Sequence, residues 1–177
     1  VQTVEVVDSF QKGVRRFQSA SQGAVTIAEL KARPVYRPGE ILEAVPGVVI
    51  SQHSGEGKAN QYFLRGFNLD HGTDMASFVA GIPVNFPTHA HGQGYSDLNF
   101  LIPELVTGVE YRKGISFADE GDFATAGAAH IAYANRLDAS VANLSYDRDG
   151  YRRALVAGPR QAARGDPPGA PEGCHTG

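Results

Sequence analysis

Hydrophobic residues in this chain come in short runs that are bounded by Gly, Pro, Asn and His. Runs that are rich in β-branched and aromatic residues and end in this way predict short strands. Such runs occupy residues 48–50, 62–65, 78–80, 109–112 and 128–133. Pro38 suits the first position of a helix, and Ile41 and Val45 share one helical face, which predicts a short helix over residues 38–45. Residues 99–106 also look helical, although Pro103 limits that helix.

Strands and short helices in this alternation predict a small α+β domain, which we place at residues 24–135. Residues 1–23 show no sustained period and are expected to form an extended arm. From residue 139 onward, alternating apolar positions, a turn at 147–150 and a second extended run predict a hairpin within residues 136–157. Residues 158–177 are rich in Pro and Gly, so we expect a tail that is disordered or read out of frame.

Composition narrows the functional classes. The chain has 177 residues, enough for one ordinary domain with a real core. Its 16 basic and 19 acidic residues form no long single-sign block, so we expect no nucleic-acid partner. Cys174 is the one cysteine, which excludes an intrachain disulfide and a CxxC site. No apolar run is long enough for a transmembrane helix.

Histidines and carboxylates gather in two nearby stretches of the sequence. Asp70, His71 and Asp74 lie in the first, and His89 and His91 form an HxH pair in the second. On a strand, an HxH pair places both imidazoles on one face, where carboxylates complete a site for zinc or another transition ion. We therefore take His71, His89 and His91 as candidate metal ligands. The alternative is that they are polar loop residues that hydrogen-bond to the backbone.

Evidence for catalysis is missing from the sequence. There is no GxSxG nucleophile elbow, and Cys174 lies in a Pro/Gly-rich tail that fixes no neighbouring base. We predict that the chain is not an enzyme and requires no cofactor.

The order of several motifs resembles the plug domain of TonB-dependent outer-membrane receptors. Residues 41–48 read ILEAVPGV and residues 63–67 read FLRGF, similar to the family's helix ending in "vPGV" and its strand ending in "RGf". Residues 79–84 (VAGIPV), 101–104 (LIPE) and 109–114 (VEYRKG) are similar to three further plug segments in the same order. One departure is Ala80, which stands where the family usually has Asp.

The resemblance implies an N-terminal plug with a mixed four-stranded sheet and short helices, lodged in a 22-stranded barrel. Residues 136–157 then correspond to the first one or two antiparallel barrel strands. The protein would lie in the outer membrane and import a scarce nutrient, such as a siderophore or metal complex, with energy delivered by TonB. The expected partners are therefore TonB, the imported small molecule or metal chelate, the chain's own β-barrel and the outer membrane.

The resemblance also assigns residues. Arg65 matches the plug arginine that pairs with barrel carboxylates in the family. The β-branched stretch in the arm is similar to the TonB box, which pairs with TonB as an added strand; its residues are Thr3, Val4, Glu5, Val6 and Val7. Substrate contacts are expected from an outward-facing loop, through Asn85, His89, His91, Gln93 and Tyr95.

Two other functions fit the residues. The first is a soluble metal-binding protein or metal-dependent enzyme that uses His89 and His91. The second is a periplasmic interaction domain that binds a partner through an exposed strand edge.

Overall fold

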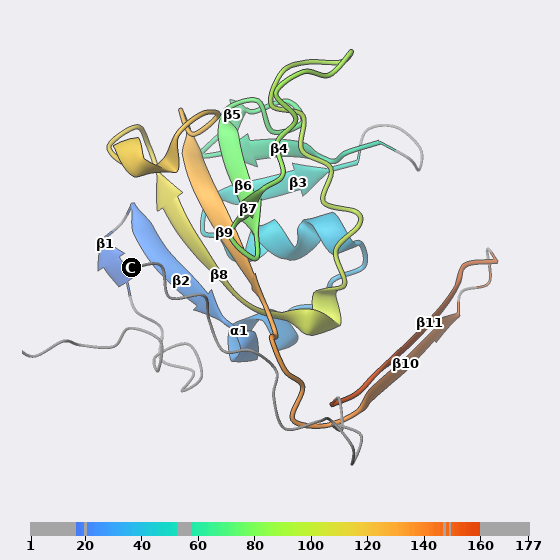
Figure 1. Ribbon diagram of the computed structural model, residues 1–177. Coiled ribbons are helices and arrows are strands. Elements are labelled where there is room, and N and C mark those ends of the chain that lie inside the picture. The colour runs from blue at the N-terminus through green and yellow to red at the C-terminus, as the bar shows by residue number, and fades with distance from the viewer. Residues whose placement is uncertain (1–16, 20, 53–57, 147, 149, 160–177) are drawn as a thin grey trace, which may run out of the picture. The chain divides into compact units, whose positions relative to one another are not determined.

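A computed structural model describes residues 17–19, 21–52, 58–146, 148 and 150–159 of the chain. The chain divides into two compact units, residues 1–134 and residues 135–177, and each is described by itself. The possible TonB box and nearly all of the expected tail lie outside the described residues. Figure 1 shows the ribbon of both units.

A mixed six-stranded sheet forms the framework of the first unit. In spatial order its strands are β1 (Phe17–Ser19), β2 (Gln22–Thr26), β8 (Val106–Lys113), β9 (Gly127–Tyr133), β6 (Met75–Val79) and β7 (Ile82–Pro83). All neighbours run antiparallel except β6 and β9, which are parallel. The expected α+β class and mixed sheet are confirmed, but the expected strand number of four is wrong. The sheet gains β1 and β2 at the junction between the expected arm and the expected domain, where β2 pairs with β8 and β1 pairs with β2.

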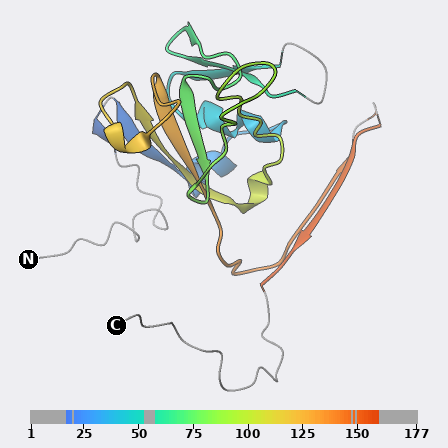
Figure 2. The same ribbon diagram turned by 45° about the horizontal axis from the view of Figure 1, so that its top comes forward.

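A second, three-stranded sheet and short helices complete this unit. The strands are β3 (Val48–Ser51), β4 (Gln61–Leu64) and β5 (Phe67–Asn68), and the helices are α1 (Ile27–Lys31), η2 (Pro38–Ala44), η3 (Pro103–Leu105) and η4 (Ala118–Glu120). In Figures 1 and 2, η2 and the small sheet lie on the same side of the six-stranded sheet. Apolar side chains from both sheets and η2, including Leu42, Tyr62 and Val109, form one buried core between them. Removing this apolar area from water is the main stabilising contribution.

Prolines decide where the helices form. The predicted helix at 38–45 is a 3₁₀ helix with Pro38 in its first turn. The predicted helix at 99–106 is wrong, because only Pro103–Leu105 is helical. Ile102 precedes this proline and is extended, with φ −109° and ψ 96°. A residue before proline is driven away from the helical region, so no turn forms ahead of Pro103.

The turn between β6 and β7 contains the departure from the family pattern. Ala80 has φ 50° and Gly81 has φ 79°, so both residues are in the left-handed region. Aspartate tolerates that conformation better than alanine does. The turn nevertheless keeps two residues between the paired Val79 and Ile82, and the Ala80 N–H donates to the Ile131 carbonyl on β9 at 2.9 Å.

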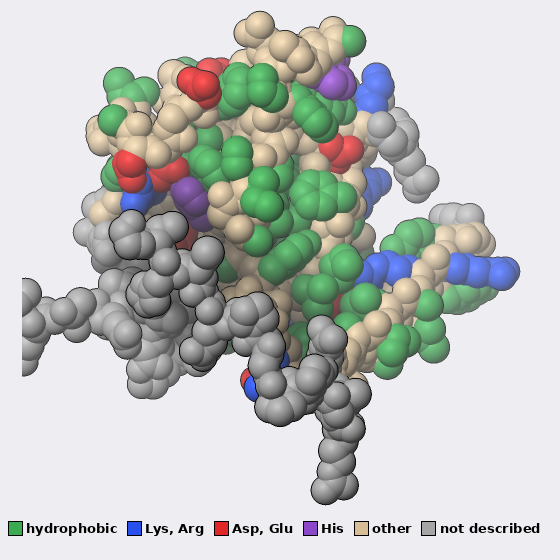
Figure 3. All heavy atoms as spheres, in the orientation of Figure 1, with side chains coloured by type: hydrophobic (Ala, Val, Ile, Leu, Met, Phe, Trp, Pro, Cys, Tyr) green, Lys and Arg blue, Asp and Glu red, His purple; other side chains and the backbone are tan. Residues whose placement is uncertain are grey.

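The second unit is a two-stranded antiparallel hairpin. β10 (Val141–Tyr146) pairs with β11 (Arg152–Ala157) in an unbroken register, which confirms the predicted hairpin. One face carries Ala142, Leu144, Tyr146, Arg152, Ala154 and Val156, and all six are exposed. Leu144, Tyr146 and Val156 are 84%, 78% and 83% exposed, which is unusual for a mostly apolar strand face in water. Figure 3 shows hydrophobic side chains along this hairpin together with basic ones.

Candidate functional site

Two loops of the first unit build the candidate site. One is the turn between β5 and β6, at residues 69–74, and the other follows β7 at residues 84–96. The Ser96 N–H donates to the His71 carbonyl at 2.8 Å, which ties the two loops together. Within the second loop, Phe86 and Tyr95 form an isolated β-bridge that closes its ends. The HxH pair thus lies in a closed loop and not on the strand that would place both imidazoles on one face.

Asn85 holds the base of this loop. Its side-chain nitrogen donates to the carbonyls of Gly72, Met75 and Gly94 at 3.1, 3.0 and 2.8 Å. Its side-chain oxygen accepts from the Ser77 N–H at 2.7 Å. Because the amide is engaged with the backbone of both loops, its geometry favours positioning over direct contact with a substrate.

Asp70, His71 and His91 come together where the loops meet. Their ligand atoms all lie within 4.8 Å of one another. Nε2 of His91 is 3.4 Å from Oδ2 of Asp70, and Nε2 of His71 is 3.7 Å from Oδ1 of Asp70. The His71 and His91 rings meet edge to face, with centroids 4.5 Å apart. We call these three residues the open cluster, because two of them reach solvent.

The side chains of the open cluster differ in burial. The His71 side chain is 2% exposed, whereas those of Asp70 and His91 are 47% and 44% exposed. Nδ1 of His71 lies 3.0 Å from the Asn60 carbonyl, which can only accept a hydrogen bond. That contact assigns the proton to Nδ1 and turns Nε2, with its lone pair, toward the other two residues. Such a second contact is what orients metal-binding histidines.

The other predicted loop residues surround the cluster. Tyr95 stacks on His89, with ring centroids 3.9 Å apart, and also approaches the rings of His71 and His91. Its hydroxyl accepts from the Ala59 N–H at 2.8 Å. Nδ1 of His89 accepts from the His91 N–H at 3.2 Å, and Gln93 is exposed. Of the three predicted metal ligands, His71 and His91 therefore lie close together. Asp70 joins them, and the sequence alone did not specify this proximity.

Two cations lie near the turn that ends η2. Arg65 is exposed with φ 53°, and its N–H donates to the Gly47 carbonyl at 2.9 Å. Nζ of Lys113 donates to the adjacent Pro46 carbonyl at 3.2 Å. Burial lowers the pKa of Lys113, and the charge of Arg65 lowers it further. Arg65 was expected from the family motif, whereas Lys113 was not, because only the topology of β8 brings it to the same turn.

A second cluster of charged residues, also missed from the sequence, lies on the other face of the six-stranded sheet. Oε2 of the buried Glu120 is 2.6 Å from Nε2 of His130, and NH1 of Arg112 is 2.9 Å from its Oε1. Arg112 also contacts Asp119 at 2.5 Å, and this hydrogen bond raises the pKa of the guanidinium. Phe78 stacks on His130 with centroids 4.4 Å apart. We call Arg112, Glu120 and His130 the closed cluster.

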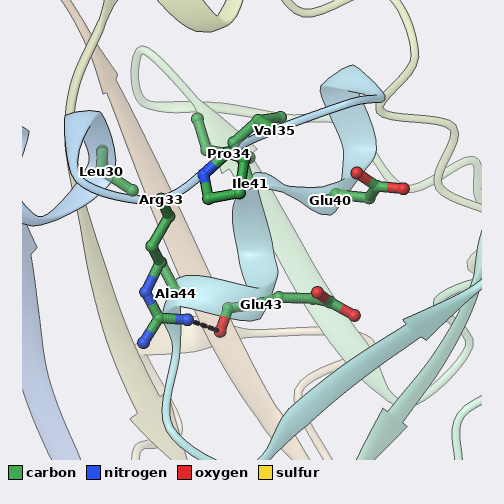
Figure 4. A pocket seen from close by; sticks show the side chains of 8 residues that line it. All are labelled: Leu30, Arg33, Pro34, Val35, Glu40, Ile41, Glu43 and Ala44. Atoms are coloured by element: carbon green, nitrogen blue, oxygen red, sulfur yellow. Dashed lines mark hydrogen bonds between the residues drawn. The ribbon is translucent and has the colours of Figure 1, made fainter.

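A small hollow lies between α1 and η2. It encloses about 250 Å³ and is lined by Leu30, Arg33, Pro34, Val35, Glu40, Ile41, Glu43 and Ala44. Figure 4 shows the Arg33 side chain crossing it to donate to the Glu43 carbonyl, at 3.0 Å. None of the predicted site residues lines this hollow, so it gives no support to the predicted cargo site.

Comparison with known proteins identifies the family. The model of the TonB-dependent receptor plug domain matches residues 15–128, which is more than half of the chain. The chain therefore belongs to the plug-domain family of TonB-dependent receptors, a transport family and not a family of enzymes. This finding confirms the family resemblance and rules out the metal-dependent enzyme that the histidines had suggested.

Solved structures support the same fold. The siderophore receptor PirA from Acinetobacter baumannii matches with a TM-score of 0.53 at 20% identity, over 72% of this chain and 19% of that one. The ferric yersiniabactin uptake receptor FyuA from Yersinia pestis matches with a TM-score of 0.52 at 19% identity, over 72% and 19%. The copper transporter OprC matches with a TM-score of 0.55 at 16% identity, over 80% and 22%.

The match covers only part of each solved receptor. The chain spans about a fifth of the length of these proteins, and the identities are low enough that the likeness concerns the fold alone. In the part of the chain that the structure describes, no helix is long and apolar enough to cross a membrane.

Proposed function

We propose that this chain is the plug of an outer-membrane receptor that imports a scarce nutrient, such as a siderophore or metal complex, with energy from TonB. The observation that carries the proposal is the plug-family match over residues 15–128. The described loop residues add to it, because exposed imidazoles and a tyrosine ring gather beside a buried histidine in one place. Such a surface suits contact with a small cargo.

The hairpin supports the proposed partnership with a β-barrel. Its mostly apolar face alternates with a mixed face, which carries Val141, Asn143, Ser145, Arg153, Leu155 and Ala157. Barrel strands alternate in this way between lipid and lumen. Tyr146 and Tyr151 flank the turn, where aromatic residues meet the membrane interface in such proteins. We therefore propose that β10 and β11 are the first strands of the barrel wall.

Arg65 and Lys113 support a plug that docks against carboxylates. Both cations are held near the turn at Pro46 and Gly47, and their mutual repulsion is part of what lowers the pKa of Lys113. A carboxylate from a surrounding barrel would relieve that repulsion and restore the pKa. We propose that Arg65 makes this contact and that Lys113 assists it.

TonB binding is assigned to the arm. The arm contains a stretch rich in β-branched residues, which favours its addition as a strand to the edge of a partner sheet. Its residues are Thr3, Val4, Glu5, Val6 and Val7. A proline in such a strand removes a backbone donor, which breaks the ladder wherever that donor faces the partner sheet. This property gives a direct test.

The test replaces Val4 and Val6 by proline in the intact receptor that carries this chain. We expect the variant to lose capture by the isolated TonB C-terminal domain and to lose energy-dependent metal accumulation, measured by mass spectrometry of cells grown under metal limitation. Prolines at Ser9 and Gln11 serve as the control and leave both readouts unchanged. Unchanged uptake in the first variant would remove the arm from the mechanism.

The remaining alternative, a periplasmic interaction domain, makes a different prediction. Cell fractionation would place such a domain in the soluble periplasmic fraction. We expect the intact gene product in the outer-membrane fraction.

A further inference from the structure

We propose that Asp70, His71 and His91 bind a divalent first-row transition ion and that this ion is the part of the cargo the plug recognises. The inference rests on the proposed import function. It replaces His89, a ligand suggested by the HxH spacing, with Asp70, which the fold brings to the two histidines.

The distances within the open cluster suit a shared ion. With metal–ligand bonds of about 2.0–2.1 Å, ligand atoms around a tetrahedral ion lie roughly 3.3 Å apart. The Asp70 carboxylate is 3.4 Å from His91 and 3.7 Å from His71, and the whole set lies within 4.8 Å. These separations are too long for good hydrogen bonds, yet small side-chain movements suffice to bring all three onto one ion.

Orientation favours the same conclusion. The Nδ1 contact of His71 with the Asn60 carbonyl fixes the tautomer whose Nε2 binds metals. The backbone around Asp70 is fixed too, because its N–H donates to Oδ1 of Asn68 at 2.8 Å and its carbonyl accepts from the Tyr62 N–H at 2.8 Å. One ligand is thus rigid and buried, and the carboxylate is attached to a fixed backbone.

Donor chemistry sets the class of ion. Two neutral imidazoles and one carboxylate supply nitrogen and oxygen donors with a single negative charge, a set that suits Zn²⁺, Cu²⁺ or Ni²⁺ and disfavours Mg²⁺ and Ca²⁺. The partial exposure of Asp70 and His91 opens the set to solvent on one side.

Three protein ligands leave at least one position on the ion open. Water fills that position when the bare ion arrives, and a chelator fills it when the ion arrives in a complex. A ferric siderophore that already occupies all six positions of its iron offers none. The geometry therefore selects a bare divalent ion or a chelate with vacant positions over a fully wrapped chelate.

His130 provides the control. Its side chain is 38% exposed, close to the 44% of His91, but it pairs with Glu120 on the other face of the six-stranded sheet. Asp70→Asn is the sharpest variant, because asparagine tolerates the left-handed backbone at this position, where φ is 51°, and removes only the anionic ligand.

The test is calorimetric titration of the intact receptor with ZnCl₂. We expect one Zn²⁺ per receptor, and Asp70→Asn and His91→Ala to weaken binding more than about tenfold, since even an indirect contact to a ligand is worth that much. His130→Ala should stay within about twofold of the unchanged receptor. Absence of a saturable site, unchanged affinity in Asp70→Asn, or an equal loss in His130→Ala would overturn the proposal.

Two comparisons separate this inference from the proposed function. A ferric siderophore with six filled positions should bind equally to the unchanged receptor and to Asp70→Asn, and a selective loss there would mean that the carboxylate contacts the chelator and not a metal. Zinc titration needs neither TonB nor transport. A receptor that binds Zn²⁺ through Asp70 but imports nothing would contradict only the proposed function.

Discussion

The plug carries two clusters in which a carboxylate meets histidine, and they differ in geometry. In the closed cluster, Glu120 is buried, 2.6 Å from His130 and 2.9 Å from Arg112. In the open cluster, the buried residue is His71 and the carboxylate of Asp70 is half exposed, 3.4 and 3.7 Å from the two imidazoles. The closed cluster pairs its buried charge within the protein, whereas the open cluster keeps its donors at separations that an ion can bridge.

This difference teaches how to separate structural histidines from binding ones. A buried charge must be paired, so a short carboxylate contact to a cation belongs to the fold. A buried imidazole that is neutral and hydrogen-bonded through one ring nitrogen carries no charge, so it does not need a short contact with a nearby exposed carboxylate. The two clusters should therefore respond in opposite ways to the changes below.

The largest effect is expected for Gly94→Ala, which breaks the open cluster alone. Gly94 has φ 80°, and an added Cβ would lie 2.7 Å from Phe123 and 2.9 Å from the Thr73 backbone. Left-handed strain and overpacking together should cost about 3 kcal/mol in urea unfolding, with loss of zinc binding. Gly114→Ala is the control, because its φ is 96° but no atom lies within 4 Å. Equal losses in both variants would contradict the packing argument.

Zinc should stabilise the protein through the open cluster. A ligand at 100 times its Kd adds about 2.7 kcal/mol to the unfolding free energy, which thermal unfolding detects. We expect the weaker binding in Asp70→Asn to cut this gain to about 1.4 kcal/mol or less at the same zinc concentration, and the full gain to persist in His130→Ala. His91 and His130 suit this comparison because their side chains are similarly exposed, at 44% and 38%. Loss of the zinc stabilisation in His130→Ala would mean that the closed cluster, and not the open cluster, binds the ion.

Arg112→Met should weaken the closed cluster. It leaves the buried Glu120 carboxylate with the His130 imidazole as its remaining partner within the cluster. Removing one partner of a buried pair costs 3–5 kcal/mol, and because Arg112 is itself 36% exposed we expect about 2 kcal/mol in urea unfolding. Zinc affinity should not change. A neutral result would show that His130 alone balances the charge.

The smallest effect is expected in acid, through the contact between Arg112 and Asp119 beside the closed cluster. The hydrogen bond from Arg112 lowers the pKa of Asp119 below its ordinary value of about 3.9. A depressed carboxyl pKa contributes stability above the unfolded value, and this is lost as pH falls through the folded value. Thermal stability should therefore fall below about pH 4, less steeply in Arg112→Met than in the unchanged chain. Identical slopes would argue against this contact.

Local patterns predicted much of the fold. Strand propensity located the cores of β3, β4, β8 and β9 but only the last two residues of β6, and alternation located the hairpin of β10 and β11. The local sequence pattern did not predict strands that form only by pairing with another strand. β2 contains Gln22, Gly23 and Ala24, which favour no strand, and it is ordered by its ladder with β8. Ile102 shows the converse, since the following proline overrides a helical pattern.

The candidate site was predicted in part for the same reason. His71 and His91 were identified by residue type, but the HxH spacing joined His91 to His89 and assumed a strand. The loop closed by Phe86 and Tyr95 instead turns His91 toward Asp70. No spacing rule relates positions 70 and 91, because two separate loops meet there. The closed cluster was missed because Arg112 and His130 become neighbours only through the register of β8 with β9.

The most direct test is a crystal structure of the intact receptor soaked in ZnCl₂, with anomalous scattering recorded at the zinc edge. The account predicts one strong peak within about 2.0–2.2 Å of Nε2 of His71, a ring nitrogen of His91 and a carboxylate oxygen of Asp70. A peak at Glu120 and His130, or no peak in the plug, would contradict it.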